Sequence, residues 1–161
     1  MPLWEQAGLS MRYQIHLDGR VETDALRRAL GRRFGIPPSA VYVGRLEDRP
    51  VTVERPAVVM TPPDGPGGFG WTLMGDRELA EATGVSELDL ARVLAQELNL
   101  RALLDDGTTH PDRWILVARD GSHGPVIVDE DAAAVGDLRI DHAEVPIPGE
   151  PELRVIPPKR Y

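Results

Sequence analysis

The sequence predicts an α+β fold, a two-layer sandwich in which two main helices pack on a mixed, mostly antiparallel sheet. Two segments repeat apolar residues with the period of a helix, and several shorter segments alternate or run apolar as strands do. Sixteen glycines and 15 prolines separate these segments with turns. The expected order is β-α-β-β-β-α-β-β with a possible last strand, and part of it is compatible with a ferredoxin-like arrangement.

The first strand and the first helix carry the clearest patterns. Polar and apolar side chains alternate through residues 12–18, which is typical of a half-buried strand and makes His16 an exposed residue on its polar face. Thr23 or Asp24 is then predicted to cap a helix that runs to residue 34, and Gly35 is expected to end it. Its four arginines predict a basic face that is either solvated or a dock for an acidic partner or phosphate: Arg27, Arg28, Arg32 and Arg33.

A second helical region follows in the middle of the chain. Residues 76–83 predict a short helix, and Ser86 has the spacing of a cap for a longer one. Leu103 and Leu104 continue the apolar stripe, so this second helix is expected to extend toward residue 107.

Short apolar or alternating runs between turns predict the remaining strands. The run at residues 114–118 is nearly all apolar and is expected to be a central strand buried on both faces. The length of 161 residues suits one domain, residues 1–161, with a proline-rich tail from about residue 146. The other expected strands are residues 40–46, 57–61, 71–74, 125–128 and 138–145.

The composition excludes several classes of protein. The absence of cysteine excludes a disulfide scaffold, a cysteine-ligated metal and a thiol nucleophile. The net charge of −8 argues against unaided binding to nucleic acid or to an anionic membrane, because both are polyanions. No stretch has the length and apolarity of a signal peptide or a membrane span, so a cytoplasmic protein is expected.

Two short patterns suggest ligands. Gly65, Gly67 and Gly70 spell G-x-G-x-x-G, but a dinucleotide loop needs a helix at its end, and Trp71 begins a predicted strand, so a hairpin loop is expected. Residues 79–94 (LAEATGVSELDLARVL) resemble the helix-turn-helix of lac-repressor-type DNA-binding proteins, with the turn at Gly84-Val85-Ser86. The resemblance implies that the second helix enters the major groove, where Glu87 and Asp89 would face the phosphates. DNA binding is therefore an alternative and not the preferred function.

Catalytic and metal-binding patterns are weak. The four histidines, His16, His110, His123 and His142, lack the spacing that brings metal ligands together on one element. No serine stands in a nucleophile elbow, and we expect no cofactor, no metal and no assignable catalytic residue. The enzymatic alternative is a small cofactor-independent enzyme that pairs His16 with a carboxylate from the 62–70 hairpin as acid and base.

The preferred hypothesis is a non-catalytic protein-binding module, and an immunity or antitoxin-like inhibitor of a partner enzyme is the closest class. An acidic surface attracts a partner with a basic surface and speeds their encounter. Trp4 is a further candidate contact if the N-terminus is exposed. The predicted partner-binding residues are Phe69, Trp71, Asp105, Asp106, Asp112, Asp129, Glu130 and Asp131.

Overall fold

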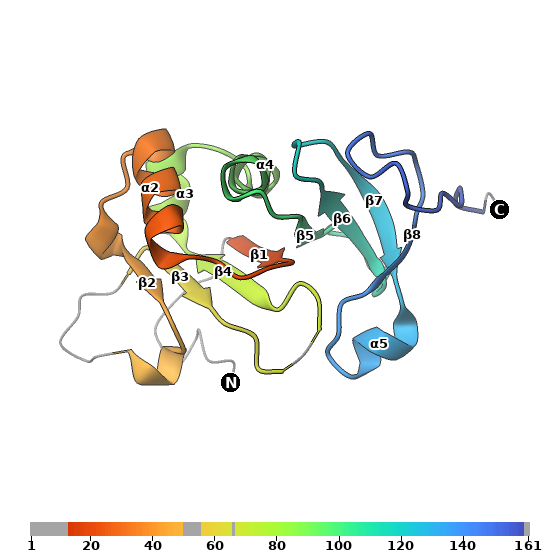
Figure 1. The fold of residues 1–161 in the computed structure, drawn as a ribbon, viewed down its shortest axis with the longest axis horizontal. Helices are drawn as coiled ribbons and strands as arrows, with labels where there is room; N and C mark the ends of the chain where they lie inside the picture. Colours follow the sequence, from red (N-terminus) through yellow and green to blue (C-terminus); the bar gives the residue numbers. More distant parts are fainter. Residues whose placement is uncertain (1–12, 50–55, 66, 160–161) are drawn as a thin grey trace.

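The computed structural model describes residues 13–49, 56–65 and 67–159 and shows one eight-stranded mixed sheet (Figure 1). The strand order is β2-β3-β4-β1-β5-β6-β7-β8, and only the β2–β3 pair is parallel. The predicted α+β class is confirmed. The elements are β1 (Tyr13–Leu17), α2 (Thr23–Phe34), β2 (Val41–Val43), β3 (Val58–Thr61), β4 (Trp71–Gly75), α3 (Arg77–Thr83), α4 (Glu87–Leu98), β5 (Ala102–Asp105), β6 (Arg113–Val117), β7 (His123–Val128), α5 (Glu130–Ala134) and β8 (Ile140–Ala143).

The first part of the chain has a ferredoxin-like arrangement. The elements β1-α2-β3-β4-α4-β5 follow the βαββαβ order, and their strands lie side by side as β3-β4-β1-β5 with every neighbouring pair antiparallel. Each helix therefore connects two strands that lie two places apart in the sheet. The short strand β2 adds a parallel edge beside β3, and β6, β7 and β8 extend the sheet on the other side.

The predicted C-terminal ends of α2 and α3 and the predicted cap of α4 are found. Gly35 adopts the left-handed conformation (φ 68°) that ends α2, and Gly84 (φ 67°) ends α3 in the same way. The Ser86 side chain accepts a hydrogen bond from the Asp89 amide and caps α4. Local sequence signals therefore decide these boundaries. The predicted cap of α2 at Thr23 or Asp24 is wrong, because Thr23 is already helical and Glu22 holds the cap position without a side-chain hydrogen bond.

The predicted extension of the second helix through Leu103 and Leu104 is wrong. The helix ends at Leu98 because Asn99 adopts a left-handed conformation (φ 55°), which Asn tolerates better than most residues. The chain then forms β5, a central strand between β1 and β6. Leu103 and Leu104 are both buried, one on each face of the sheet, so their adjacency in the sequence imitates a helical stripe.

The sheet carries two cores on opposite faces. The first core packs α2 and α4 onto β1, β3 and β4, with Leu26, Leu30, Leu90 and Leu94 fully buried. The second core lies across the other face of β5, β6 and β7 and contains Phe69, Leu103, Leu116, Val126 and Ile147. The strands β5 and β6 contribute to both cores, which agrees with the prediction of a central strand at 114–118.

The proline-rich segment after β8 lies along the second core. Ile147 is 3% exposed, and the Gly149 amide donates to Ser122 Oγ at 2.8 Å. Further along, Val155 forms a parallel bridge with Ala143. No helix in the described part of the chain is long and apolar enough to cross a membrane.

Candidate functional site

Four of the predicted acidic residues meet in one depression, which we call the acidic groove. Asp112 comes from the β5–β6 connection, and Asp129, Glu130 and Asp131 come from the start of α5. Asp141 of β8, which the sequence analysis did not single out, completes the acidic lining. The groove has a volume of about 320 Å³, and Ile127 and Val128 form its apolar part.

The five acids of the groove differ in what already binds them. The Asp129 side chain caps α5 by accepting from the Ala132 amide at 3.0 Å. Asp141 Oδ2 lies 2.6 Å from His142 Nδ1 and 3.0 Å from Arg154 Nη2, and the His142 contact lowers the pKa of Asp141 most. Within the described residues, the side chains of Asp112, Glu130 and Asp131 have no hydrogen-bond or ion-pair partner. These three carboxylates are therefore available to a partner.

The acids of the groove do not form a metal site. Among the described residues, no group of three histidines, aspartates or glutamates lies close enough to hold one metal ion. These carboxylates line the groove without converging on one point. Such an arrangement fits a ligand whose positive charge is distributed over several groups, such as the basic side chains of a protein.

Asp105 and Asp106 lie outside the groove. Asp105 is exposed and its Oδ1 accepts from the Gly107 amide at 2.7 Å. The Asp106 side chain is only 7% exposed, and its Oδ2 lies 3.5 Å from Arg113 Nε. Arg113 Nε also lies 2.7 Å from the buried Glu144 Oε1, an ion pair without hydrogen-bond alignment. Asp106 therefore belongs to an internal charge cluster and is not a surface contact.

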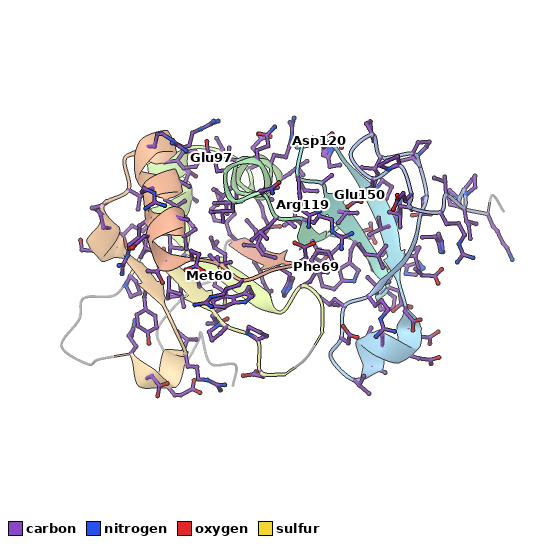
Figure 2. All side chains as sticks on the ribbon, viewed as in Figure 1. Met60, Phe69, Glu97, Arg119, Asp120 and Glu150 are labelled. Carbon is purple, nitrogen blue, oxygen red and sulfur yellow. The ribbon has the colours of Figure 1, made fainter. Side chains whose placement is uncertain are left out.

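The two aromatic residues predicted to contact a partner lie on different faces of the sheet. Phe69 is 4% exposed and belongs to the second core, and Figure 2 shows it in the middle of the molecule. Trp71 is half-buried and packs against the first core. The 62–70 hairpin thus turns Phe69 inward, so the two rings do not form one apolar contact surface. Trp4 lies outside the described residues.

A second depression, which we call the His16 cleft, lies over the face of β1 and β4 that α2 and α4 leave uncovered. Its volume is about 710 Å³, and His16 and Thr72 line it together with the glycines of the hairpin on one side and residues 135–138 on the other. Asp137 joins the two sides, because its Oδ1 accepts from the Gly68 amide at 3.3 Å. A Cβ on Gly67 would lie 2.8 Å from the same oxygen, so the close approach requires glycine there.

His16 is the one histidine that lines this cleft, and it was predicted to be exposed. Its Nδ1 lies 3.1 Å from Thr72 Oγ1, and its ring meets Trp114 edge-on with 5.6 Å between ring centroids. Burial lowers the pKa of His16 below its ordinary value of 6.5, so the ring is neutral at pH 7. The hairpin and residues 135–138 cover this part of the sheet, which strand alternation alone does not reveal.

His16 and a carboxylate of the 62–70 hairpin do not form the predicted acid–base pair. Asp64 of the hairpin lines the same cleft as His16, but its side chain is 94% exposed and lies 3.4 Å from Arg45. A hydroxyl group and not a carboxylate orients the His16 ring.

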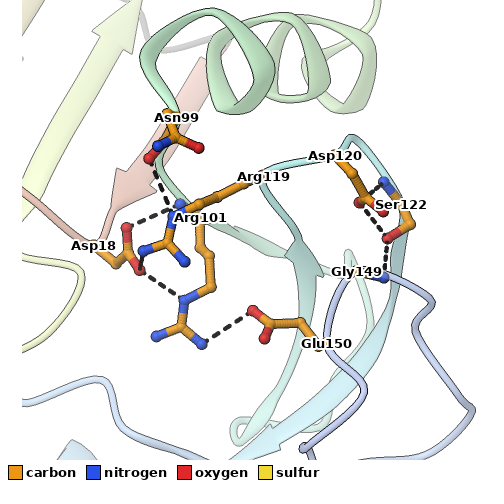
Figure 3. Close-up of polar contacts among 8 residues, drawn as sticks. All are labelled: Asp18, Asn99, Arg101, Arg119, Asp120, Ser122, Gly149 and Glu150. Carbon is orange, nitrogen blue, oxygen red and sulfur yellow. Dashed lines mark hydrogen bonds and ion pairs between the residues drawn. The ribbon is translucent and has the colours of Figure 1, made fainter.

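A charged cluster that no sequence motif predicted joins the two halves of the sheet (Figure 3). Arg101 donates to Asp18 Oδ2 through Nε at 2.7 Å and to Glu150 Oε1 through Nη1 at 3.2 Å. Arg119 Nη2 lies 3.6 Å from the same Asp18 oxygen, and the Arg101 guanidinium lies 5.3 Å from the centre of the Phe69 ring. We call the four charged residues, Asp18, Arg101, Arg119 and Glu150, the Arg101 cluster. They come from four separate segments, and no local pattern marks them.

The helix pair that resembles a helix-turn-helix is present as α3 and α4, with Gly84 in the turn. The side chain of Glu87, at the first position of α4, accepts from the Gln14 amide at 2.7 Å, and burial raises the pKa of Glu87. One side of α4 is buried against the sheet, and its first turn carries Glu87 and Asp89. Two of the four arginines on the basic face of α2 already have intramolecular partners, because Arg32 and Arg33 both form ion pairs with Glu97 of α4.

No family model, no curated protein and no solved structure matches this chain. The function is therefore argued from its own residues.

Proposed function

We propose that this protein is a non-catalytic, cytoplasmic protein-binding module that uses the acidic groove to bind a partner with a basic surface. An inhibitor of the immunity or antitoxin type fits this chemistry, because nucleases and similar enzymes have basic active sites that an acidic surface can cover. The observation that carries the proposal is the meeting of Asp112, Glu130 and Asp131 in one depression, each without a partner within the described residues.

Electrostatics supports a protein over the other ligand classes. The chain has a net charge of −8, which repels nucleic acid, and the groove acids do not converge on a metal position. Ile127 and Val128 add apolar groups to the lining of the groove. Protein–protein contacts usually combine apolar and polar surface.

The test is affinity capture from an extract of the native cells, followed by measurement of the affinity for the captured partner. The bait is the full chain or its variant with Asp112→Asn, Glu130→Gln and Asp131→Asn, which removes three charges and leaves the Asp129 cap and the Asp141 ion pairs in place. We expect the groove variant to lose at least about tenfold in affinity, since removal of charge at a contact slows encounter and weakens the complex.

The matched control carries Glu78→Gln, Glu81→Gln and Glu152→Gln, which removes the same charge from exposed acids outside the groove. This control should bind like the original chain, and the partner should have an excess of Lys and Arg at its contact surface. Equal loss in both variants, or an unchanged affinity in the groove variant, would contradict the proposal.

A further inference from the structure

Among the residues that the structure describes, the charged residues that line the His16 cleft are Asp64 and Asp137. Each is paired with an arginine outside the lining: Asp64 Oδ1 lies 3.4 Å from Arg45 Nη1, and Asp137 Oδ2 lies 3.0 Å from Arg139 Nη2. Asp137 Oδ1 also accepts from the Gly68 amide. Pro63, Phe69 and Leu138 contribute apolar walls. The cleft therefore combines acceptor oxygens at its rim with an apolar interior.

Thr72 Oγ1 has two polar neighbours, because His16 Nδ1 lies at 3.1 Å and the Gly70 carbonyl oxygen at 3.5 Å. In the arrangement where the hydroxyl donates to the carbonyl and accepts from Nδ1, the neutral ring carries its lone pair on Nε2. No described residue hydrogen-bonds Nε2. In this arrangement the ring of His16, which lines the cleft, offers a free acceptor, and burial, which lowers the pKa of His16, disfavours its protonation.

We propose that the His16 cleft binds an organic cation, a guanidinium or primary ammonium group carried on a small apolar body. The N–H groups of such a cation donate to His16 Nε2 and to the carboxylates of Asp64 and Asp137, and its apolar body packs against the walls. A volume of about 710 Å³ lies within the range of small-molecule sites, roughly 300 to 1,000 Å³. Among the described residues, the lining offers an anion two carboxylates and no arginine or lysine, since Arg45 and Arg139 pair with these carboxylates from outside the lining. A metal ion would find no group of three convergent ligands there.

This inference is independent of the protein-binding proposal, because the acidic groove has a different lining. The test titrates the full chain with three molecules of the same size and different charge: benzamidinium, benzamide and benzoate. Binding is read by NMR from the His16 imidazole and from the Trp114 indole N–H, which belongs to the ring in contact with His16. Saturable shifts with benzamidinium are expected, with at least threefold weaker binding of benzamide and none of benzoate.

Two variants locate the cation. The double variant Asp64→Asn and Asp137→Asn keeps an amide oxygen for the Gly68 amide and removes both charges, and it should weaken benzamidinium binding by about threefold to tenfold. The control variant Glu78→Gln and Glu81→Gln removes two charges from α3 and should bind benzamidinium like the original chain. The groove variant described above should also bind it normally, so this experiment and the partner capture can fail separately.

The tautomer has its own readout. Long-range nitrogen–proton correlations should show the His16 proton on Nδ1, and Thr72→Val should abolish this preference and weaken benzamidinium binding. Because Asp64 is 94% exposed, Asp64→Asn alone tests the charge without risk to folding, and its effect should be a smaller loss of the same sign.

Competition distinguishes the source of the natural cation. If the capped peptide acetyl-Leu-Arg-Leu-amide binds more tightly than agmatine, the cation belongs to a protein or peptide, and the reverse order indicates a free small molecule. Three results would overturn the proposal: no saturable shift with any cation, equal binding of benzamide, or the same affinity in the Asp64/Asp137 variant as in the control.

Discussion

His16 shows how one residue acquires properties that its position in a strand does not predict. Alternation in β1 places it on the face away from α2 and α4, where a histidine is ordinarily solvated. The hairpin and residues 135–138 cover that face, and the resulting burial lowers the pKa of His16. Its environment is therefore a tertiary property.

The lowered pKa of His16 predicts a loss of stability in acid. Between the folded pKa and 6.5, the unfolded chain binds a proton at this residue that the folded chain does not. The free energy of unfolding should therefore fall as the pH drops below about 6.5. Urea unfolding from pH 8 to pH 5 should show this fall in the original chain and a flatter profile in His16→Gln.

The control for this pH profile is His123→Gln, because His123 is exposed at the start of β7 and lines neither depression. It should reproduce the original profile. If the free energy of unfolding changes by the same amount from pH 8 to pH 5 in His16→Gln and in the original chain, the assignment of a lowered pKa to His16 is wrong.

At the scale of elements, the contacts that hold the segment after β8 include a close approach to the β6–β7 turn. The Gly149 amide donates to Ser122 Oγ, which in turn donates to Asp120 Oδ1 at 2.6 Å. A Cβ on Gly149 would lie 2.3 Å from Asp120 Oδ1 and 2.6 Å from Ala118 Cβ. Only glycine permits the two segments to approach this closely.

Gly149→Ala should therefore destabilise the fold by about 1 to 3 kcal/mol, the usual cost of forcing an extra carbon into a packed contact. Gly65→Ala is the matched control, since nothing lies within 4 Å of the Cβ that it adds, and its effect should stay within about 0.5 kcal/mol. Denaturant midpoints measure both. Similar midpoints for the two variants would show that the tail contact carries no stability.

At the scale of the whole molecule, the Arg101 cluster joins the ferredoxin-like part to the C-terminal part. Asp18 follows β1, Arg101 precedes β5, Arg119 follows β6, and Glu150 lies beyond β8. The Asp18 side chain is 7% exposed, so its charge depends on the two arginines for compensation. In Figure 3 dashed lines join its carboxylate to both arginines.

Arg101→Met should cost about 2 to 3 kcal/mol, less than the loss of a fully buried pair because Arg101 is 29% exposed. The comparison is Arg20→Met, which breaks a pair with Glu22 whose side chains are 79% and 67% exposed, and which should cost under about 0.5 kcal/mol. Adding Asp18→Asn to Arg101→Met should recover part of the loss, because the uncompensated charge is removed. A double variant less stable than Arg101→Met would refute this account.

The sequence alone was enough to predict the α+β class, the C-terminal ends of α2 and α3, the start of α4 and most of the strands. These features follow from alternation, helical spacing and caps such as Gly35 and Ser86, which act over a few residues. The sequence did not predict β5. Leu103 and Leu104 pack into two different cores, one on each face of the sheet, and no local signal distinguishes such a pair from part of a helical stripe.

Which side chains share a surface follows from the packed fold and not from local sequence patterns. The fold brought Asp112 and Asp141 to the start of α5, turned Phe69 and Asp106 inward, and covered His16 with the hairpin. Asp112 and Asp141 are 29 positions apart in the chain, so no local sequence pattern can show that they lie close together. Strand pairing sets the distance between them. The physical reason is that burial and charge compensation depend on every segment packed around a side chain, while a local pattern reports only its neighbours in sequence.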